Sequence, residues 1–433
     1  MFEVREKPQQ VERAFLLGAY FDRRDEQEAE SLVAELADLV DTLGIQIQDK
    51  RAIFVRDQNK AFLTGVGKRD EIIELLHAEE CDCLIFDNAL SPLQQKNWEA
   101  AAEVTVIDRE EVILDIFAMR AQTKEARLQV ELARMQYALP RMAKMWAHLD
   151  RQGGGAGGGK GGGAAARGEG EKQIEVDRRL ARERIERARR ELAGVQKQRA
   201  TQRKEREKNP IPHAAIVGYT NAGKSTLLNT FTDSDVLAKD MLFATLDPTT
   251  RRIELPDGQA MLLTDTVGFV RNLPHRLVQA FKATLEEALL ADFLIHVLDA
   301  SSPSVREYHE TTLQVLEELG AEDKRMIIAL NKIDQIEEPS VLHSLQQDFP
   351  GAVYLSLKSG EGKDTLLHAI NDMLVDRVQR LDLRIPQSRG DILHQVHREG
   401  KVLSEEYEGN DVLISAVIPT PMLHLFAPFR IAS

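Results

Sequence analysis

Residues 218–225 read Gly-Tyr-Thr-Asn-Ala-Gly-Lys-Ser and follow directly on the apolar run Ala-Ala-Ile-Val. GxxxxGKS between a strand and a helix is typical of a phosphate-binding loop, whose backbone N–H groups surround a phosphate. Lys224 would reach the β/γ oxygens, and the Ser225 hydroxyl would ligate Mg²⁺. The pattern predicts an α/β domain that binds a nucleoside triphosphate. The predicted loop residues are Gly218, Tyr219, Thr220, Asn221, Ala222, Gly223, Lys224 and Ser225.

Two further motifs follow, each after an apolar run that predicts a buried strand. The first is a DxxG sequence, which would place a carboxylate near Mg²⁺ and a glycine N–H near the γ-phosphate. The second is an NKxD sequence, which selects the base, because a fixed Asp334 carboxylate accepts from both N1–H and N2–H₂ of guanine. Together they favour GTP over ATP. These residues are Asp265, Thr266, Val267 and Gly268, and Asn331, Lys332, Ile333 and Asp334.

Asn331 is expected on the other side of the base, with the stem of Lys332 over its face. Ser356, Leu357 and Lys358 would close the site with backbone donors to the guanine O6. The order of the motifs along the chain is the one that a GTP-binding domain requires.

The segment between the loop and DxxG is where a switch that senses the γ-phosphate should lie, and one of its threonines must complete the Mg²⁺ shell. The Phe-Ala-Thr-Leu pattern resembles the switch of Obg-like GTPases and favours Thr245; Thr249 is the runner-up and Thr250 a third candidate. The metal ligands expected are therefore Ser225 and Thr245. The switch residues predicted to contact GTP are Phe243, Ala244, Thr245, Leu246 and Asp247.

Phe269 follows DxxG, at the position where many small GTPases have a glutamine that orients the attacking water. A phenyl ring cannot do this, so no residue of the chain is assigned as catalytic. We expect slow hydrolysis that needs a partner surface, a rearranged switch or a monovalent cation. Asn221 matches an asparagine of potassium-stimulated GTPases, although a structural loop amide is an equal alternative.

Charge is distributed unevenly along the chain. The 433 residues carry a net charge of −14, yet residues 172–208 hold fourteen Lys and Arg against seven Asp and Glu. A basic segment in an acidic protein indicates a local anionic partner, with RNA as one candidate; a solvated helix face with i,i+4 pairs is the alternative. The lack of a long apolar run predicts no membrane span, and the two cysteines, Cys81 and Cys83, favour a reducing cytoplasm, with peripheral membrane association left open. We expect a monomer in solution.

Alternating apolar runs and helical patterns predict four parts in a multidomain α/β chain. An N-terminal α/β domain is expected over residues 1–109, and a long antiparallel helical hairpin over 110–208. A GTPase domain with a mainly parallel sheet should cover 209–377, and a small α+β domain 378–433. We expect a continuous helix from Glu110 to Leu149, and a final strand at Leu423–Leu425.

The hairpin loop, residues 152–170, is rich in glycine and basic. A flexible linker would explain it, but antiparallel helices need only a few connecting residues. A tip that becomes ordered against a partner is the interpretation we prefer.

Several segments resemble HflX GTPases over nearly the whole chain. They include Ile113–Ala121, Leu128–Ala133, Arg151–Gly155, Glu175–Arg179 and the Asp-Thr-Val-Gly-Phe-Val run at 265–270. The resemblance implies a GTPase that binds the large ribosomal subunit, with its Gly-rich hairpin tip near the peptidyl transferase centre. It also implies that the protein separates stalled 70S ribosomes into subunits.

Two departures from the family pattern affect details of the site. The loop is lengthened by further glycines and has Gly168-Glu169-Gly170 without the usual proline, while Leu357 replaces an alanine. Two other functions stay open: a nucleotide-gated regulator that grips a protein, and an RNA-remodelling factor with an N-terminal ATPase activity, for which the chain shows no second phosphate loop.

Overall fold

The computed structural model describes residues 11–152, 176, 178–195, 197, 211–232, 242–243, 245–256, 259–274, 287–374 and 378–431. The chain divides into two compact units. Unit 1 comprises residues 1–196 with two later segments, 240–246 and 271–282, and unit 2 comprises the remainder. The glycine-rich residues 153–170, for which an ordered tip is predicted, lie outside the described residues, as does Ala244.

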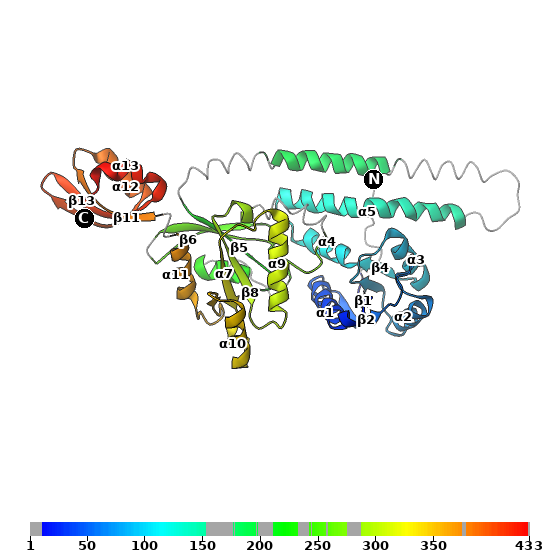
Figure 1. Cartoon of the computed structure of the whole chain (residues 1–433). Helices are drawn as coiled ribbons and strands as arrows, with labels where there is room; N and C mark the ends of the chain where they lie inside the picture. The colour runs from blue at the N-terminus through cyan, green and yellow to red at the C-terminus, as the bar shows by residue number, and fades with distance from the viewer. Residues whose placement is uncertain are drawn as a thin grey trace, which may run out of the picture. The chain divides into compact units, whose positions relative to one another are not determined.

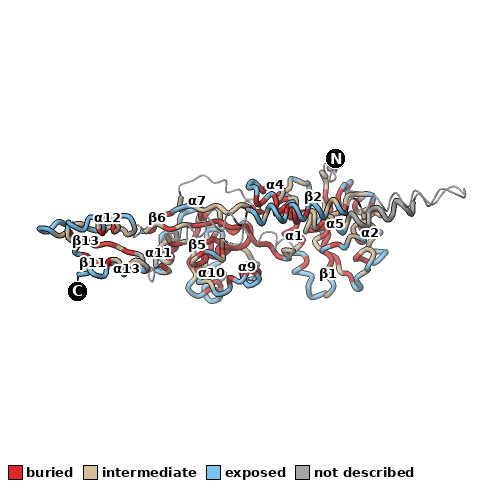
Figure 2. Tube along the Cα trace, turned by 90° about the horizontal axis from the view of Figure 1, so that it is seen from above, coloured by how far each residue is buried: buried red, intermediate tan, exposed pale blue. Residues whose placement is uncertain are grey.

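Unit 1 is built on a four-stranded parallel sheet in the order β2-β1-β3-β4 (Figure 1). The strands β1 and β3 are apolar over nearly their whole length, as expected for parallel strands covered on both faces. Figure 2 shows the buried residues of β1 in red. The elements are β1 Arg13–Tyr20, α1 Glu26–Thr42, β2 Gln46–Phe54, α2 Val66–Ala78, β3 Cys83–Phe86, α3 Pro92–Ala102 and β4 Thr105–Asp108.

Helix α3 has local sequence signals that the apolar pattern does not reveal. Ser91 accepts from the N–H of Gln94, the Gln94 side chain accepts from the N–H of Ser91, and Pro92 occupies the first turn. This is a capping box, which satisfies two N–H groups that a helix start leaves without partners. Trp98 of the same helix is fully buried in the core of unit 1.

The predicted continuous helix from Glu110 to Leu149 is wrong in one respect. The structure has two helices, α4 Arg109–Arg120 and α5 Lys124–Gln152. The backbone of Ala121 is extended, and the Thr123 hydroxyl accepts from the N–H of Ala126, so α4 ends and a new helix start is capped. Apolar periodicity continues through this break because both helices bury one face.

The second arm of the hairpin is helical over the described residues 178–195 and packs against α5 (Figure 1). The contact is a small apolar cluster in which Leu132 of α5 meets Ile185 and Ala188. Met135, Leu139 and Leu192 pack at its border. The remaining faces of the second arm are exposed to solvent.

Unit 2 contains a six-stranded sheet in the order β10-β9-β8-β5-β7-β6, in which only β6 is antiparallel. Its strands are β5 His213–Gly218, β6 Thr249–Glu254, β7 Ala260–Asp265, β8 Phe293–Asp299, β9 Met326–Asn331 and β10 Val353–Tyr354. Its helices are α7 Lys224–Thr232, α9 Val305–Leu319, α10 Pro339–Asp348 and α11 Lys363–Leu374. The carboxyl ends of the parallel strands lie at one edge of the sheet, so the residues that follow these strands are brought together there.

The last part of the chain forms a three-stranded antiparallel sheet in the order β11-β13-β12, covered by α12. The predicted strand at Leu423–Leu425 is wrong: these residues begin the short helix α13 Leu423–Phe426, whose Phe426 is buried in this core. A three-residue apolar run does not distinguish a strand from a helical turn. The elements are β11 Val378–Pro386, α12 Gly390–Glu399, β12 Lys401–Glu408 and β13 Asp411–Pro419.

A buried polar network fixes α5 to the sheet of unit 1. The Tyr137 hydroxyl lies 3.0 Å from Asp108 and 3.1 Å from Glu111, and Arg141 donates to the other oxygen of Asp108 at 3.0 Å. The Arg141 guanidinium also lies 3.3 Å from the centre of the Tyr137 ring. Burial, followed by the charges of Asp108 and Asp115, raises the pKa of Glu111 to about 7.

We predict that Glu111→Gln removes a pH dependence of stability. Because the folded pKa exceeds the unfolded one, the native state binds the extra proton, and this stabilisation is complete below pH 4.5 and lost as pH rises to about 7. The difference in unfolding free energy between wild type and variant should change by up to roughly 3 kcal/mol between pH 4.5 and 8, favouring the variant at pH 8. Urea unfolding followed by tryptophan fluorescence measures it, since Trp98 and Trp146 both belong to unit 1.

Glu131→Gln is the matched control, because Glu131 is exposed on α5. Its stability profile should run parallel to that of the wild type. A parallel profile for Glu111→Gln as well would contradict the prediction.

Candidate functional site

The phosphate loop connects the end of β5 to the start of α7, and two glycines allow it to lie against neighbouring strands. A Cβ at Gly218, where φ is +145°, would be 2.2 Å from the Val297 carbonyl oxygen. A Cβ at Gly223, where φ is +104°, would be 2.3 Å from Nδ2 of Asn331. Any side chain at these positions would displace the loop from the strand ends.

Lys224 and Ser225 stand at the first turn of α7. Lys224 is buried, and its Nζ donates to the carbonyl of Tyr219 at 2.7 Å. Burial lowers the pKa of Lys224 to about 8, and the charge of Asp265 opposes this shift. The cation therefore lies inside the loop, where it can contact phosphate oxygens.

The Ser225 hydroxyl donates to Oδ2 of Asp265 at 2.7 Å, so the structure brings the first and second motifs together. A hydroxyl and a carboxylate oxygen side by side are hard ligands of the kind that Mg²⁺ prefers. The donor set thus fits the cation that the phosphate-loop pattern predicts.

The three candidate switch threonines differ in position. Thr245 lies in the segment of residues 240–246 that belongs to unit 1. Thr249 is the register partner of Asp265 across β6 and β7. The Thr250 hydroxyl is 2.8 Å from the Thr264 hydroxyl, which is 2.7 Å from Nε2 of His213. Thr250 therefore hydrogen-bonds to a neighbouring strand of the sheet.

Phe269 is joined to the phosphate loop by its backbone. Its N–H donates to the Gly218 carbonyl at 3.1 Å, and its carbonyl accepts from the N–H of Thr220 at 2.8 Å. The ring is 1% exposed and forms part of the core. Phe269 therefore fixes DxxG beside the loop and offers no group that could orient water.

Asn331, the last residue of β9, connects two loops of the site. Its Nδ2 donates to the Ala222 carbonyl at 2.9 Å, and its Oδ1 accepts from the N–H of Leu357 at 3.1 Å. The amide is thus used to hold the phosphate loop and the Ser356–Lys358 segment together, a role that the sequence motif alone does not indicate. Ser356 is fully buried, and its hydroxyl accepts from the N–H of Ser359.

Lys332 and Asp334 follow at the carboxyl end of β9. Lys332 has a φ of +65°, and its Nζ is 2.7 Å from Oδ2 of Asp299. Asp334 is exposed, within the short 3-10 helix Ile333–Gln335. Within the part of the chain that the structure describes, the Asp334 carboxylate accepts no hydrogen bond.

The segments 240–246 and 271–282, which flank the switch and DxxG regions in the sequence, belong to unit 1. Sequence reasoning missed their contacts. Phe243 is 2% exposed and packs edge-on against Phe117, with ring centres 4.6 Å apart. Arg271, directly after the DxxG region, donates to Glu35 at 2.8 Å. Glu35 also pairs with Arg109, which reaches Asp87 at 2.7 Å. Arg271 and Glu35 stand 236 residues apart and beside apolar residues, so no local pattern predicts their contact.

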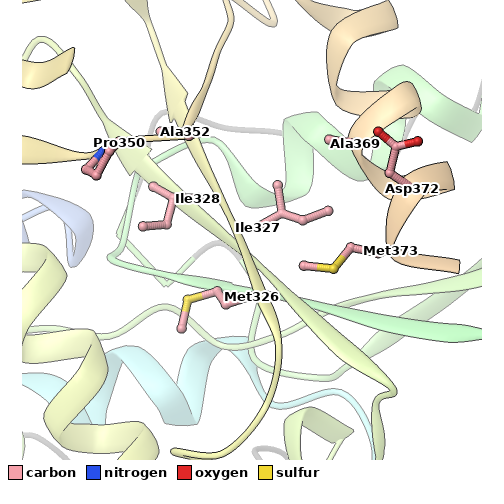
Figure 3. Close-up of a pocket in the computed structure, with 9 residues that line it drawn as sticks. Met326, Ile327, Ile328, Pro350, Ala352, Ala369, Asp372 and Met373 are labelled. Carbon is pink, nitrogen blue, oxygen red and sulfur yellow. The ribbon is translucent and has the colours of Figure 1, made fainter. Parts of the chain in front are cut away.

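A pocket in unit 2 lies away from these motifs (Figure 3). It is lined by the first residues of β9, Met326 to Ile328, whereas Asn331 ends the same strand. Three residues of strand, or about 10 Å, separate Ile328 from Asn331. Asp372 is the one charged residue of its lining, and no nucleotide motif contributes to it. The other lining residues are Pro350, Gly351, Ala352, Ala369, Asp372 and Met373.

A mainly parallel sheet with a phosphate loop, DxxG and NKxD at its carboxyl edge defines a P-loop GTPase domain. Three family models match the chain: a GTP-binding GTPase N-terminal region over residues 30–118, a GTP-binding GTPase middle region over 120–206 and a 50S ribosome-binding GTPase over 213–332. The chain is 59% identical to the GTPase HflX of Akkermansia muciniphila over 433 residues, which cover 99% of each protein. It is 41% identical to the GTPase HflX of Escherichia coli, over 95% of this chain and 94% of that protein.

The chain therefore belongs to the HflX GTPase family, and it hydrolyses GTP. A GTP-binding protein of Sulfolobus solfataricus, solved with GDP, is similar at 24% identity and a TM-score of 0.43, over 84% of this chain and 99% of that one. In the described part of the chain, no helix is long and apolar enough to cross a membrane.

Gly268→Ala should impair hydrolysis more than nucleotide binding. The new Cβ would lie 2.7 Å from Cγ2 of Thr220 and 2.9 Å from Nζ of Lys224, so the DxxG backbone must move away from the phosphate loop. We expect the turnover rate to fall at least about tenfold, because a rearranged γ-phosphate contact affects the transition state most. Single-turnover GTP hydrolysis and GDP titration measure the two effects.

Gly390→Ala is the control for this substitution. Gly390 begins α12, and a Cβ there meets no atom within 4 Å. Its turnover should equal that of the wild type. Wild-type turnover in Gly268→Ala would show that the close approach at Gly268 does not matter for hydrolysis.

Proposed function

We propose that this GTPase is a switch that binds the large ribosomal subunit in the cytoplasm and splits or rescues stalled 70S ribosomes. The observation that carries the proposal is a row of exposed arginines on the second arm of the hairpin. The family description, a 50S ribosome-binding GTPase, and the HflX relatives favour the same partner.

The arginine row lies on the solvent side of the described helical residues 178–195. Arg182, Arg184 and Arg187 are exposed, while Ile185 and Ala188 of the same helix are buried against α5. The apolar stripe of this arm is thus used inside the hairpin, and its cationic side faces outward. The seven exposed arginines are Arg178, Arg179, Arg182, Arg184, Arg187, Arg189 and Arg190.

Ion pairs within the arm account for only part of this charge. Arg179 lies 3.7 Å from Glu183, and Arg189 lies 2.8 Å from Glu186. Such exposed pairs contribute little and are easily exchanged for another anion. Arginine binds phosphate groups through paired N–H donors, so the surface suits RNA better than a protein groove.

Nucleotide binding in this proposal uses the residues placed at the sheet edge. Lys224 and the loop N–H groups would hold the phosphates, and Ser225, Asp265 and the switch threonine Thr245 would hold Mg²⁺ directly or through water. When bound, Mg²⁺ would neutralise charge that develops on the phosphate oxygens. Asp334 would accept from guanine, and the Ser356–Lys358 segment would close the base pocket. The predicted domain boundaries at 109/110, 208/209 and 377/378 are part of the same proposal.

Hydrolysis in the proposed cycle requires a group that the described site does not supply. Phe269 occupies the position of a water-orienting glutamine, and its ring is buried. Contact with the large subunit would rearrange the switch or supply the missing group, which makes GTP hydrolysis a signal for release. The hairpin tip, residues 152–170, would approach the ribosomal RNA that the arm binds.

Asp334→Asn should exchange guanine preference for xanthine preference. Xanthine carries a carbonyl where guanine carries N2–H₂, so an amide donor fits it and a carboxylate repels it. We expect GTP affinity to fall by about 100-fold or more and XTP affinity to exceed it, as measured by calorimetry. In Lys224→Ala, by contrast, both nucleotides should lose binding. Unchanged GTP affinity in either variant would refute the site assignment.

Arg182, Arg184 and Arg187 replaced together by Gln should weaken binding to large ribosomal subunits. Loss of three phosphate contacts lowers affinity and reduces the slope of log affinity against log salt by about 2 to 3. Sedimentation with purified large subunits and a non-hydrolysable GTP analogue measures both quantities. The stimulation of GTP turnover by large subunits is measured in parallel for both proteins. It should be smaller for the variant than for the wild type.

Replacing Glu183, Glu186 and Glu191 by Gln provides the matched control, because it raises the charge of the same exposed arm. This variant should bind the subunits more tightly than the wild type. Binding that does not respond to salt or to either triple substitution would favour a protein-binding regulator. ATP hydrolysis by the Lys224→Ala variant would favour the N-terminal ATPase alternative.

A further inference from the structure

Asp299, the last residue of β8, belongs to none of the three nucleotide motifs, yet it meets one of them. It is the register partner of Asn331 across β8 and β9. Its Oδ2 lies 2.7 Å from Nζ of Lys332, and the side chains of Asp299 and Lys332 are 20% and 21% exposed. The pair is thus largely shielded from water at the carboxyl edge of the sheet.

The Asp299 carboxylate is itself held in one orientation. Its Oδ1 accepts from the Ser301 N–H at 3.0 Å and from the Ser301 hydroxyl at 2.6 Å. These bonds form in the turn after β8 and leave Oδ2 directed to the ammonium. A carboxylate fixed in this way forms a stronger charge-assisted contact than one that must first be ordered.

Lys332 needs such a partner because of its own geometry. A lysine has a long flexible stem and loses much rotamer freedom when it is fixed. Its backbone is left-handed, with φ +65°, which is rare for a residue with a side chain. The direction of the stem is therefore set by two constraints, the left-handed backbone at one end and Asp299 at the other.

Strand pairing does not depend on this side-chain contact. The N–H of Ala300 donates to the carbonyl of Asn331 at 2.8 Å, and β8 and β9 pair over six residues on each strand. The backbone alone thus joins the two strand ends. An ion pair added at this point constrains the Lys332 side chain more than it constrains the sheet.

We propose that Asp299 is a positioning residue for nucleotide binding: by holding the Lys332 ammonium, it fixes the lysine stem as one wall of the guanine site. The inference rests on the proposed assignment of NKxD to the base. Asp299 touches no nucleotide in this scheme and acts only through Lys332. Base choice stays with Asp334, whereas affinity for any nucleotide whose base lies under the stem depends on Asp299.

A double-mutant cycle on the full chain tests the inference. Asp299→Asn removes the charge, and Lys332→Met keeps an apolar stem but removes the ammonium. Each should lower GDP affinity by about three- to tenfold, the range expected for a partly buried ion pair. If Asp299 acts through the ammonium, the double variant should be no weaker than Lys332→Met. Additive losses in the double variant, or unchanged affinity in Asp299→Asn, would overturn it.

Base preference provides the second measurement. Asp299→Asn should keep the wild-type ratio of GTP to XTP affinity, while Asp334→Asn inverts it. A changed ratio in Asp299→Asn would also overturn the inference. If Asp334→Asn leaves the ratio unchanged, the guanine-site assignment is wrong, whatever Asp299 does. The two failures are therefore distinguishable.

Asp292→Asn is the matched control, because Asp292 lies just before the other end of β8 and its Oδ2 accepts from the His213 N–H at 2.9 Å. This variant should lose stability in urea unfolding but keep GDP affinity. Asp299→Asn should show the reverse pattern. Equal effects of the two substitutions on stability and on affinity would mean that Asp299 only supports the strand, which contradicts the proposal.

Discussion

The close approach of the phosphate loop to the strand ends is the constraint on which the site depends. At Gly218 the loop backbone passes so near the Val297 carbonyl that a Cβ would be 2.2 Å from its oxygen, and at Gly223 the neighbour is the Asn331 amide. With glycine at both positions, the Asn331 side chain can form hydrogen bonds to both Ala222 and Leu357. The segments predicted to bind phosphate and base are thus joined by hydrogen bonds within unit 2.

The bonds around Phe269 show how a GTPase can be well ordered and still lack a water-orienting group. Its N–H and carbonyl both bond to the phosphate loop, and its ring is buried. Structural order and chemical competence are therefore separate properties at this position. In the proposed cycle, a partner would alter the rate by moving this segment or by adding a group beside it.

The nucleotide motifs were predictable from the sequence because each depends on a local pattern: a strand end, a glycine at a required position and a polar residue beyond it. The parallel sheets were predictable for a similar reason, since buried strands such as β3 are apolar throughout. The break between α4 and α5 was not predictable, because Ala121 and Thr123 end one helix and begin the next without interrupting the apolar stripe.

The Asp299–Lys332 pair, the Glu35 cluster and the bridging role of Asn331 also escaped prediction. Each joins residues that are distant in sequence, such as Glu35 and Arg271, and whose proximity is set by the fold. Asp299, Glu35 and Arg271 each stand beside apolar residues, and a single charge in such a stretch does not identify its partner. Long-range contacts of this kind appear only when strand order and register are known.

Helix α5 is attached to the sheet of unit 1 near its middle, through Asp108, Tyr137 and Arg141. From Arg141 to Gln152 the helix continues for about 16 Å at its usual rise per residue. A tilt of α5 by about 10° at this attachment would move Gln152 by about 3 Å. The direction of α5 up to Gln152 thus depends on a buried carboxylate at the end of β4, Asp108, and on the two α5 side chains that bind it.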